Sequence, residues 1–202
     1  FTLPVQYSGK FQGGKLPILA TIEYTDFALK QFFQKASAMP WYNNTLFVIT
    51  SDHTALAEHP YYQTSAGSYA IPIIFFQPNS RIKAEKAYTV QQTDIMPGVL
   101  DYLHYHKPFV AFGQSLFDTT AQRWAVSYNN GTYQLVKNKH MLLYSADKSL
   151  GLYNLTTDSL QKKNLLHRDT TQRRLLEQQL NAIIQSYNHC MLFNQLHTTT
   201  TK

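Results

Sequence analysis

An apolar run that ends abruptly in two ionisable side chains is the feature that most constrains the fold. The segment TLFVITSDHT, residues 45–54, is apolar from Leu46 to Ile49 and then delivers Asp52 and His53. An unbroken run of this kind is typical of a strand covered on both faces, as in a parallel sheet. We therefore expect a core strand that ends by presenting a carboxylate beside an imidazole.

The neighbouring segments indicate an α/β architecture. Over residues 17–39, apolar residues recur at spacings of three and four, which predicts an amphipathic helix. The segment AIPIIFFQP, residues 70–78, is a second apolar run and predicts another core strand. QQTDIMPGVLDYLHY, residues 91–105, predicts a helix whose first turn Thr93 can cap.

After residue 120 the pattern changes to short strands. RWAVSY and TYQLV flank Asn-Asn-Gly at residues 129–131, which predicts a hairpin, and HMLLYS and GLYNL extend the series. From about Thr171 the helical spacing of apolar residues returns. We expect residues 1–120 to form part of an α/β core, and residues 121–202 to add antiparallel strands and a packing helix to the same domain.

Composition and charge exclude some classes of protein. The chain has 202 residues, 44% of them hydrophobic, which suits a globular domain, and no stretch approaches the roughly 20 apolar residues of a membrane-spanning helix. The net charge is +6, but Lys and Arg are scattered, so we expect no nucleic-acid partner. Cys190 permits no internal disulfide and is expected to be a small buried hydrophobe. The chain lacks an initiating Met, so we expect a processed product or a piece of a longer protein.

Asp52 and His53 are candidate metal ligands. Neighbouring side chains on a regular strand point to opposite faces, so these two converge only if the chain turns once the strand has ended. Ligands of open α/β sheets bind at this end of the strands. A carboxylate oxygen with an imidazole nitrogen suits Zn²⁺ and also Mn²⁺. Two ligands do not complete a site, and the residues equally allow Asp52 to cap the next turn with His53 packed beside it.

Five segments, taken in order, resemble the sulfatase group of the alkaline phosphatase superfamily. They are LPILATIEYTDFALKQFFQKASAMPWYNNTLFVITSDHT, YAIPIIFFQP, QQTDIMPGVLDYL, FGQSLF and GLYNLTTDSLQKKNLL. They resemble, respectively, the approach to the Asp-His metal pair, the next core strand, the following helix, a Gly-x-Ser-Leu turn and a late segment with an acidic turn. The resemblance covers about residues 1–170. It implies the C-terminal part of an alkaline-phosphatase-like fold, with mostly parallel core strands and flanking helices, then a small antiparallel sheet and a C-terminal helix.

Within this superfamily, the chain most resembles the lipoteichoic acid synthase-like and phosphoethanolamine transferase-like branch. In that branch a segment like FTLP, with which this chain starts, follows a His-x-Pro stretch. The branch's nucleophile, a metal-bound Thr, and its other acidic metal ligand lie upstream of Phe1. The resemblance implies a parent anchored in the inner or plasma membrane, with its catalytic domain in the periplasm or at the cell surface.

The resemblance also implies roles for individual residues. Asp52 and His53 would bind a divalent metal, either Zn, Mn or a similar ion, with Mg and Ca as alternatives. His59 lies where relatives sometimes place a substrate-contacting histidine, although the residues around it do not match that motif and a loop-packing role competes. Thr54 stands where many sulfatases have Gly, so we expect it to shape the loop.

Three functional hypotheses follow. The first is a fragment of a membrane-anchored phosphoglycerol or phosphoethanolamine transferase that acts on phospholipid headgroups and is inactive alone. The second is a fragment of a hydrolytic sulfatase or phosphodiesterase that acts on sulfate or phosphate esters. The third is a non-catalytic binding module whose metal site is a relic. The fold cannot choose among them, because one scaffold carries many chemistries.

Overall fold

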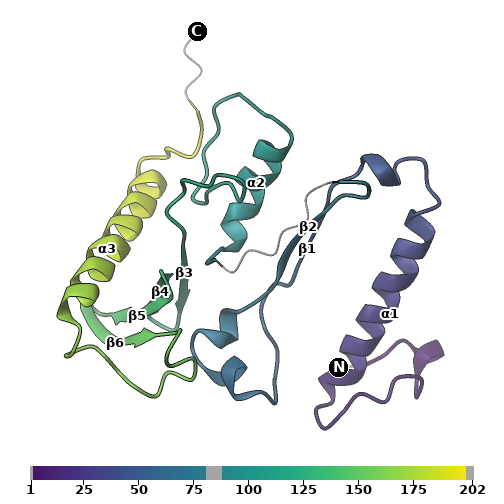
Figure 1. Ribbon diagram of the computed structural model, residues 1–202, viewed down its shortest axis with the longest axis horizontal. Coiled ribbons are helices and arrows are strands. Elements are labelled where there is room, and N and C mark those ends of the chain that lie inside the picture. Colours follow the sequence, from purple (N-terminus) through teal and green to yellow (C-terminus); the bar gives the residue numbers. More distant parts are fainter. Residues whose placement is uncertain (1, 81–87, 199–202) are drawn as a thin grey trace. The chain divides into compact units, whose positions relative to one another are not determined.

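The computed structural model describes residues 2–80 and 88–198, and the chain divides into two compact units, Phe1–Glu85 and Lys86–Lys202 (Figure 1). The helices are α1 (Ile18–Ala36), α2 (Ile95–Tyr102) and α3 (Thr170–Leu192). The strands are β1 (Phe47–Thr50), β2 (Ile73–Phe76), β3 (Trp124–Asn129), β4 (Thr132–Lys137), β5 (His140–Ser145) and β6 (Lys148–Asn154). Short 3₁₀ turns are η1 (Val5–Tyr7), η2 (Tyr42–Asn44), η3 (Pro60–Gln63), η4 (Gly67–Tyr69) and η5 (Gln92–Asp94). This mixture of helices and sheets confirms the predicted α/β class.

Aromatic contacts hold α1 against the two strands of the first unit. The ring of Phe33 on α1 lies 5.2 Å from that of Phe47 on β1 and 5.8 Å from that of Phe76 on β2. The rings of Phe47 and Phe76 stack on each other at 5.9 Å. Aromatic pairs at these distances add attraction beyond the apolar area that they bury. The strand that precedes Asp52 is therefore fixed by three mutually contacting rings.

The two strands of the first unit run antiparallel, with Phe47 opposite Phe76 and Thr50 opposite Ile73. The parallel pairing suggested by their apolar runs is therefore wrong for β1 and β2. An unbroken apolar run indicates burial on both faces but carries no information about strand direction. In this unit the burial itself is incomplete, because Ile74 is 47% exposed.

The second unit contains a four-stranded antiparallel sheet in the order β3-β4-β5-β6. Asn130 and Gly131 have φ angles of 48° and 78°, and they form the two-residue turn between β3 and β4. Positive φ at both central residues matches the right-handed twist of a hairpin, which explains the Asn-Gly pair. The predicted hairpin and the two further strands are confirmed.

A leucine core joins this sheet to α3. Leu135, Leu142 and Leu152 from successive strands meet Leu176 and Leu180 of α3, and all are almost fully buried. The helix begins beside Asp169, whose carboxylate accepts a hydrogen bond from the backbone N–H of Gln172 at 2.9 Å. The predicted C-terminal helix is confirmed. Cys190, expected to be buried, is half-buried on this helix.

The start of α2 is capped differently from the sequence-based expectation. Gln91 and Asp94, rather than Thr93, form a reciprocal capping box at η5. Asp94 is 4% exposed and also accepts a hydrogen bond from the backbone N–H of Gln114 at 2.8 Å. The Asp94 carboxylate accepts hydrogen bonds from the backbone N–H groups of two separate segments, at Gln91 and Gln114, and is therefore favoured as the cap over a single hydroxyl.

Residues 91–117 belong to the second unit and pack against its strand β3 and its helix α3. The Gln91 side chain accepts a hydrogen bond from the backbone N–H of Val126 at 3.1 Å, and the ring of Phe112 lies 5.1 Å from that of Tyr187. The second unit accordingly starts well before residue 120, where the sequence pattern changes to short strands. The grouping of residues 1–120 and 121–202 into one domain stays a prediction. Within the described residues, no helix combines the length and apolarity needed to cross a bilayer.

Gly113, in the FGQSLF segment, generates a first prediction. A Cβ atom at this position would lie 2.1 Å from the carbonyl oxygen of Thr93, which is backbone and cannot move aside cheaply. We expect Gly113→Ala to lower the free energy of unfolding by about 3 kcal/mol, the upper end of overpacking costs, in urea denaturation. Gly14→Ala is the control, because its added methyl meets only the end of the Leu19 side chain. Equal stabilities of the two variants would contradict this packing argument.

Asp94 generates a second prediction. Burial raises the pKa of its carboxyl above the ordinary 3.8, although hydrogen bonds from Gln114 and Gln91 and the charge of Arg123 act in the opposite direction. Because the pKa of Asp94 is higher in the folded protein than in the unfolded chain, this residue stabilises the folded state fully below pH 3.8. That stabilisation is lost as the pH rises through the folded-state pKa.

We therefore expect the free energy of unfolding of the wild-type protein to fall as the pH rises just above 3.8. In Asp94→Asn, whose side chain cannot ionise, this fall should be absent. Urea denaturation of both proteins across this range measures it. Asp26→Asn, on the exposed surface of α1, should keep the wild-type pH dependence. Parallel curves for wild type and Asp94→Asn would rule the assignment out.

Candidate metal centre

The chain turns directly after β1, and this turn brings Asp52 and His53 together. The backbone N–H of His53 donates to Oδ1 of Asp52 at 2.9 Å. The other carboxylate oxygen, Oδ2, lies 3.3 Å from Nε2 of the His53 ring. The convergence that a regular strand forbids is thus achieved once the strand has ended. Both side chains face solvent, with exposed fractions of 85% for Asp52 and 70% for His53.

A backbone carbonyl fixes which ring nitrogen of His53 carries a proton. Nδ1 of His53 lies 2.7 Å from the carbonyl oxygen of Thr54. Because a carbonyl oxygen only accepts, Nδ1 must be the donor. In the neutral ring the lone pair is then on Nε2, which faces the Asp52 carboxylate. Two acceptor atoms this close attract each other only through a cation, either a proton on the ring or a bound metal ion.

The spacing of the two acceptors fits a shared metal ion. Zinc binds imidazole nitrogen and carboxylate oxygen at about 2.1 Å, so two ligands at tetrahedral positions lie about 3.4 Å apart. The Nε2–Oδ2 separation of 3.3 Å agrees with this value. The pair supplies two ligands only, and the described part of the chain contains no cluster of three or more His, Cys, Asp or Glu side chains suited to a metal. A metal ion bound by this pair would need further ligands.

The loop that follows the pair is closely packed. The Thr54 hydroxyl donates to the carbonyl oxygen of Ser68, which ties the residue beside His53 to the far end of the loop. Thr64 accepts from the backbone N–H of Gly67 at 3.0 Å. A Cβ atom on Gly67 would lie 1.8 Å from the carbonyl oxygen of Tyr61, so only glycine permits this approach. Thr54 therefore shapes the loop, as expected from the sequence.

His59 lies in the same loop and caps η3. Its Nδ1 accepts a hydrogen bond from the backbone N–H of Tyr61 at 3.2 Å, and its ring packs against that of Tyr62. This is the loop-packing role that competed with substrate contact in the sequence. In the neutral ring the remaining proton is on Nε2, which leaves a donor for a substrate oxygen. Its substrate-binding role stays a prediction.

Sequence reasoning missed the partner that orients His53. The Thr54 carbonyl belongs to the backbone, which every residue carries, so no residue type announces it. The one available signal was the position of Thr54 directly after the pair. Its hydroxyl bond to Ser68 holds the backbone that in turn holds the imidazole.

Part of the chain is similar to known proteins. Residues 7–105 match the Sulfatase family model. An arylsulfatase of Clostridium perfringens (strain 13 / Type A) is 24% identical over 181 residues, which cover 80% of this chain and 37% of that protein.

Solved structures share the fold. A protein of the Bacteroides thetaiotaomicron locus for metabolism of multiple glycosaminoglycans has a TM-score of 0.64 at 19% identity, covering 81% of this chain and 44% of its own. The phosphonate monoester hydrolase of Agrobacterium radiobacter has a TM-score of 0.62 at 15% identity, covering 83% and 40%. A third protein, solved in complex with its substrate D-glucosamine-2-N,6-O-disulfate, has a TM-score of 0.57 at 17% identity, covering 83% and 39%.

The chain spans less than half the length of each of these relatives. At such identities the solved structures speak for the fold, and the matched residues include both Asp52 and His53. Enzymes of the sulfatase family generally use a metal ion, which agrees with the donor set of the pair. The chain therefore shares its fold with these structures, and residues 7–105 match the Sulfatase family model.

Proposed function

We propose that this chain supplies Asp52 and His53 as metal ligands to an enzyme that hydrolyses sulfate or phosphate esters. The observation that carries the proposal is the approach of Oδ2 to Nε2 at 3.3 Å, at the end of β1 and inside the sulfatase-matched segment. The arylsulfatase and the phosphonate monoester hydrolase among the similar proteins support an ester hydrolase.

The two side chains contribute in different ways. His53 presents Nε2 in the tautomer that can ligate, because the Thr54 carbonyl keeps the proton on Nδ1. Asp52 brings the negative charge that offsets a divalent cation. A mixed nitrogen and oxygen pair favours Zn²⁺ or Mn²⁺ over Mg²⁺ or Ca²⁺, which prefer oxygen alone. When bound, the metal would activate the attacking oxygen and offset charge building on the ester.

Sulfate esters of sugars are the substrate class that the similar structures favour. One of them is solved with a disulfated glucosamine, and others belong to a glycosaminoglycan locus. The high exposure of Asp52 and His53 is compatible with a polar ester that approaches from solvent. His59, with a donor at Nε2, would then bind an ester oxygen from the neighbouring loop.

The transferase hypothesis remains a second proposal. It rests on the resemblance of FTLP at the chain start to the phosphoglycerol and phosphoethanolamine transferase branch, which also implies a membrane-anchored, extracytoplasmic parent. The comparisons support the superfamily and not this branch. Product analysis distinguishes the two, because a transferase passes the phosphoglycerol or phosphoethanolamine group to an acceptor alcohol and releases the lipid alcohol, whereas a hydrolase passes the same group to water.

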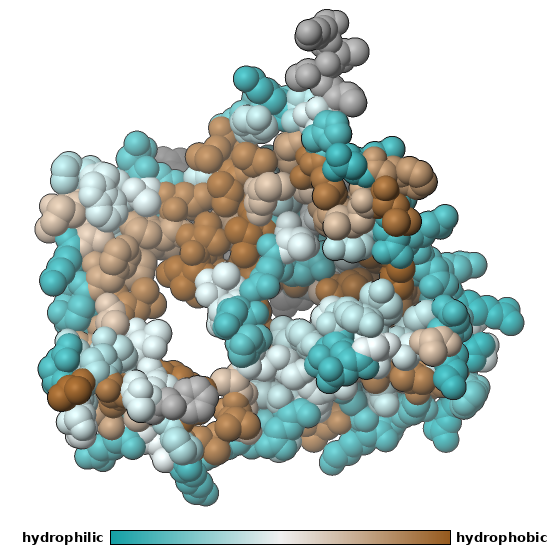
Figure 2. Space-filling view, turned by 180° about the vertical axis from the view of Figure 1, so that it is seen from behind, coloured by the Kyte–Doolittle hydropathy of each residue, from teal (hydrophilic) through white to brown (hydrophobic). Residues whose placement is uncertain are grey.

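We further propose that a longer polypeptide completes the site. The first unit leaves large apolar side chains in solvent, with Ile22 50%, Phe32 47% and Ile74 47% exposed. Figure 2 shows broad apolar areas on one face of the molecule. Apolar areas of this kind usually mark a surface that another segment covers. The same additional residues would supply the missing ligands and the nucleophile.

The metal-ligand assignment is tested in the full-length protein that contains this chain. We expect Asp52→Asn to lower kcat/KM for an aryl sulfate at least about 100-fold and to reduce bound metal, because metal sites lose about 10- to 100-fold in affinity or activity even when an outer partner is removed. Metal content is measured by mass spectrometry. Asp26→Asn is the matched control and should change neither quantity. Metal loss with intact activity would favour a relic site, and retention of both would refute the assignment.

The proposed incompleteness gives a separate prediction. The purified 202-residue chain should show no turnover of an aryl sulfate or a phosphodiester above that of its Asp52→Asn variant. Two protein ligands leave a metal ion loosely held, and the described residues provide no third. Turnover by the wild-type chain that the substitution removes would show that the chain contains a complete catalytic site.

A further inference from the structure

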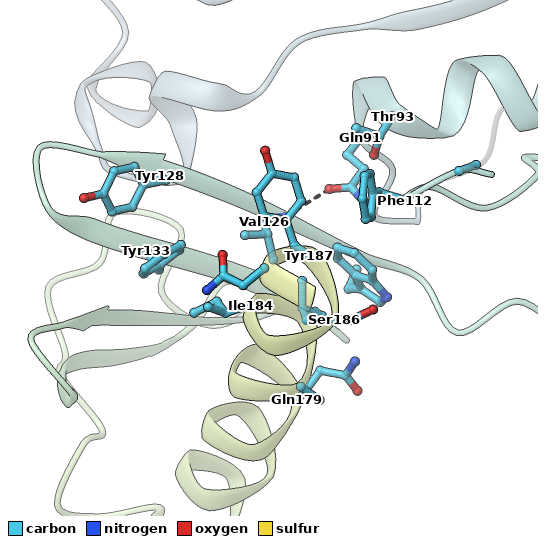
Figure 3. A pocket seen from close by; sticks show the side chains of 15 residues that line it. Gln91, Thr93, Phe112, Val126, Tyr128, Tyr133, Gln179, Ile184, Ser186 and Tyr187 are labelled. Atoms are coloured by element: carbon cyan, nitrogen blue, oxygen red, sulfur yellow. Dashed lines mark hydrogen bonds between the residues drawn. The ribbon is translucent and has the colours of Figure 1, made fainter. Parts of the chain in front are cut away.

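A cavity of about 640 Å³ lies wholly within the second unit, away from the residues of the metal pair in sequence (Figure 3). Its wall is formed by one face of β3 and β4, the C-terminal half of α3 and two short segments near η5 and the FGQSLF turn. The lining residues are Gln91, Thr93, Ala111, Phe112, Trp124, Val126, Tyr128, Tyr133, Gln179, Ala182, Ile183, Ile184, Ser186, Tyr187 and Asn188. Its volume is in the range of small-molecule sites.

Aromatic rings dominate two sides of this cavity. Tyr128 and Tyr133 face each other across β3 and β4, with ring centres 4.6 Å apart. On the other side, Tyr187 projects from α3 toward Phe112, as Figure 3 shows, with ring centres 5.1 Å apart. Tyr128 is 60% exposed and Tyr187 47% exposed, so both offer ring surface to a ligand. Trp124 adds a fifth aromatic side chain to the lining.

The polar groups of the cavity are neutral. Among its described lining residues, none carries a carboxylate, an ammonium, a guanidinium or an imidazole group. The Gln179 carbonyl oxygen accepts a hydrogen bond from Nζ of Lys137 at 2.9 Å, which leaves its amide N–H groups as donors. Asn188, Ser186 and the tyrosine hydroxyls add further donors and acceptors.

We propose that this cavity binds a neutral sugar residue. A pyranose ring has apolar C–H faces that stack on aromatic rings and a rim of hydroxyls that amides and hydroxyls can bond. The cavity offers both complements and no net charge. A sulfated or phosphorylated ligand would find no cation in the lining, because Nζ of Lys137 lies outside it and is already held by the carbonyl oxygens of Gln179 and Gln122. A purely apolar ligand would leave the Gln179 amide donors unpaired at a cost of about 1–3 kcal/mol.

This inference does not rest on the metal pair. It uses only side chains of the second unit, so it stands whether the enzyme hydrolyses, transfers or is inactive. A neutral sugar site in the same chain as an ester-cleaving site would hold unmodified residues of a glycan chain.

Tryptophan fluorescence tests the proposal directly. In the Trp41→Phe variant, Trp124 is the remaining tryptophan and lies in the cavity lining. We expect the neutral trisaccharides cellotriose and tri-N-acetylchitotriose to shift its emission, with at least one saturating at a Kd of about 1 mM or tighter. Cellotriose 6-sulfate, which has the same length and one negative charge, should bind at least tenfold more weakly than unmodified cellotriose. No saturation by either neutral probe, or tighter binding of the sulfated sugar, would overturn the proposal.

Two variants distinguish a sugar site from an apolar groove. Tyr128→Ala removes an exposed ring and should raise the Kd for the neutral trisaccharide at least tenfold, whereas Tyr105→Ala, 44% exposed and outside the lining, should leave it unchanged. Gln179→Leu keeps the approximate volume but removes the amide donors, so it should also weaken the trisaccharide. Lys137 retains Gln122 as an acceptor at 3.2 Å in that variant. Unchanged sugar binding in Tyr128→Ala, or tighter sugar binding in Gln179→Leu, would refute the assignment.

Discussion

The contact on which the metal pair depends is the packing of three phenylalanine rings. Phe33 of α1 lies against Phe47 and Phe76, one from each of the paired strands, and so sets where β1 lies on the helix. The loop that carries Asp52 and His53 starts at the end of that strand. Thr50 reinforces the end by donating to the carbonyl oxygen of Pro72 at 2.9 Å. The loop then departs from a point that both the helix and the neighbouring strand define.

Backbone groups orient the side chains of Asp52 and His53. The N–H of His53 holds one oxygen of Asp52, and the carbonyl of Thr54 holds one nitrogen of His53. These hydrogen bonds use Oδ1 of Asp52 and Nδ1 of His53, and they leave Oδ2 and Nε2 facing each other. Such oriented ligands lose less freedom when a metal binds than two unrestrained side chains would. A pair this exposed can therefore still be a prepared site.

The sequence predicted the elements well and their relations less well. The hairpin of β3 and β4 was readable because Asn130 and Gly131 require an unusual backbone conformation that few residues allow. The helix α3 was readable from its leucine spacing. The direction of β1 relative to β2 was not, since apolar runs report burial and not orientation. The capping of η5 by Gln91 and Asp94 was not predicted, because the Asp94 carboxylate is also held by the backbone N–H of Gln114, which is far from it in sequence.

The same distinction holds at the candidate site. Asp52 and His53 were identifiable because their residue types and position are unusual after an apolar run. The tautomer of His53 and the cap formed by His59 depend on backbone atoms, which sequence patterns do not specify. The cavity of the second unit was invisible for a related reason. Its aromatic and amide groups come from β3, β4, α3 and two connecting segments, and only the folded chain brings them together.

The two units differ in the number of hydrophobic side chains that each buries. The second buries Leu135, Leu142, Leu152, Leu176 and Leu180 between its sheet and α3. Among its described residues, the first buries only Ile18, Ala36 and Ala66 as hydrophobic side chains. A unit with so little buried apolar surface gains little free energy from its own packing. The proposed sugar binding uses only side chains of the well-packed unit, whereas the proposed metal chemistry at Asp52 and His53 would need the first unit to be covered. Sugar binding would therefore survive conditions that remove the metal chemistry.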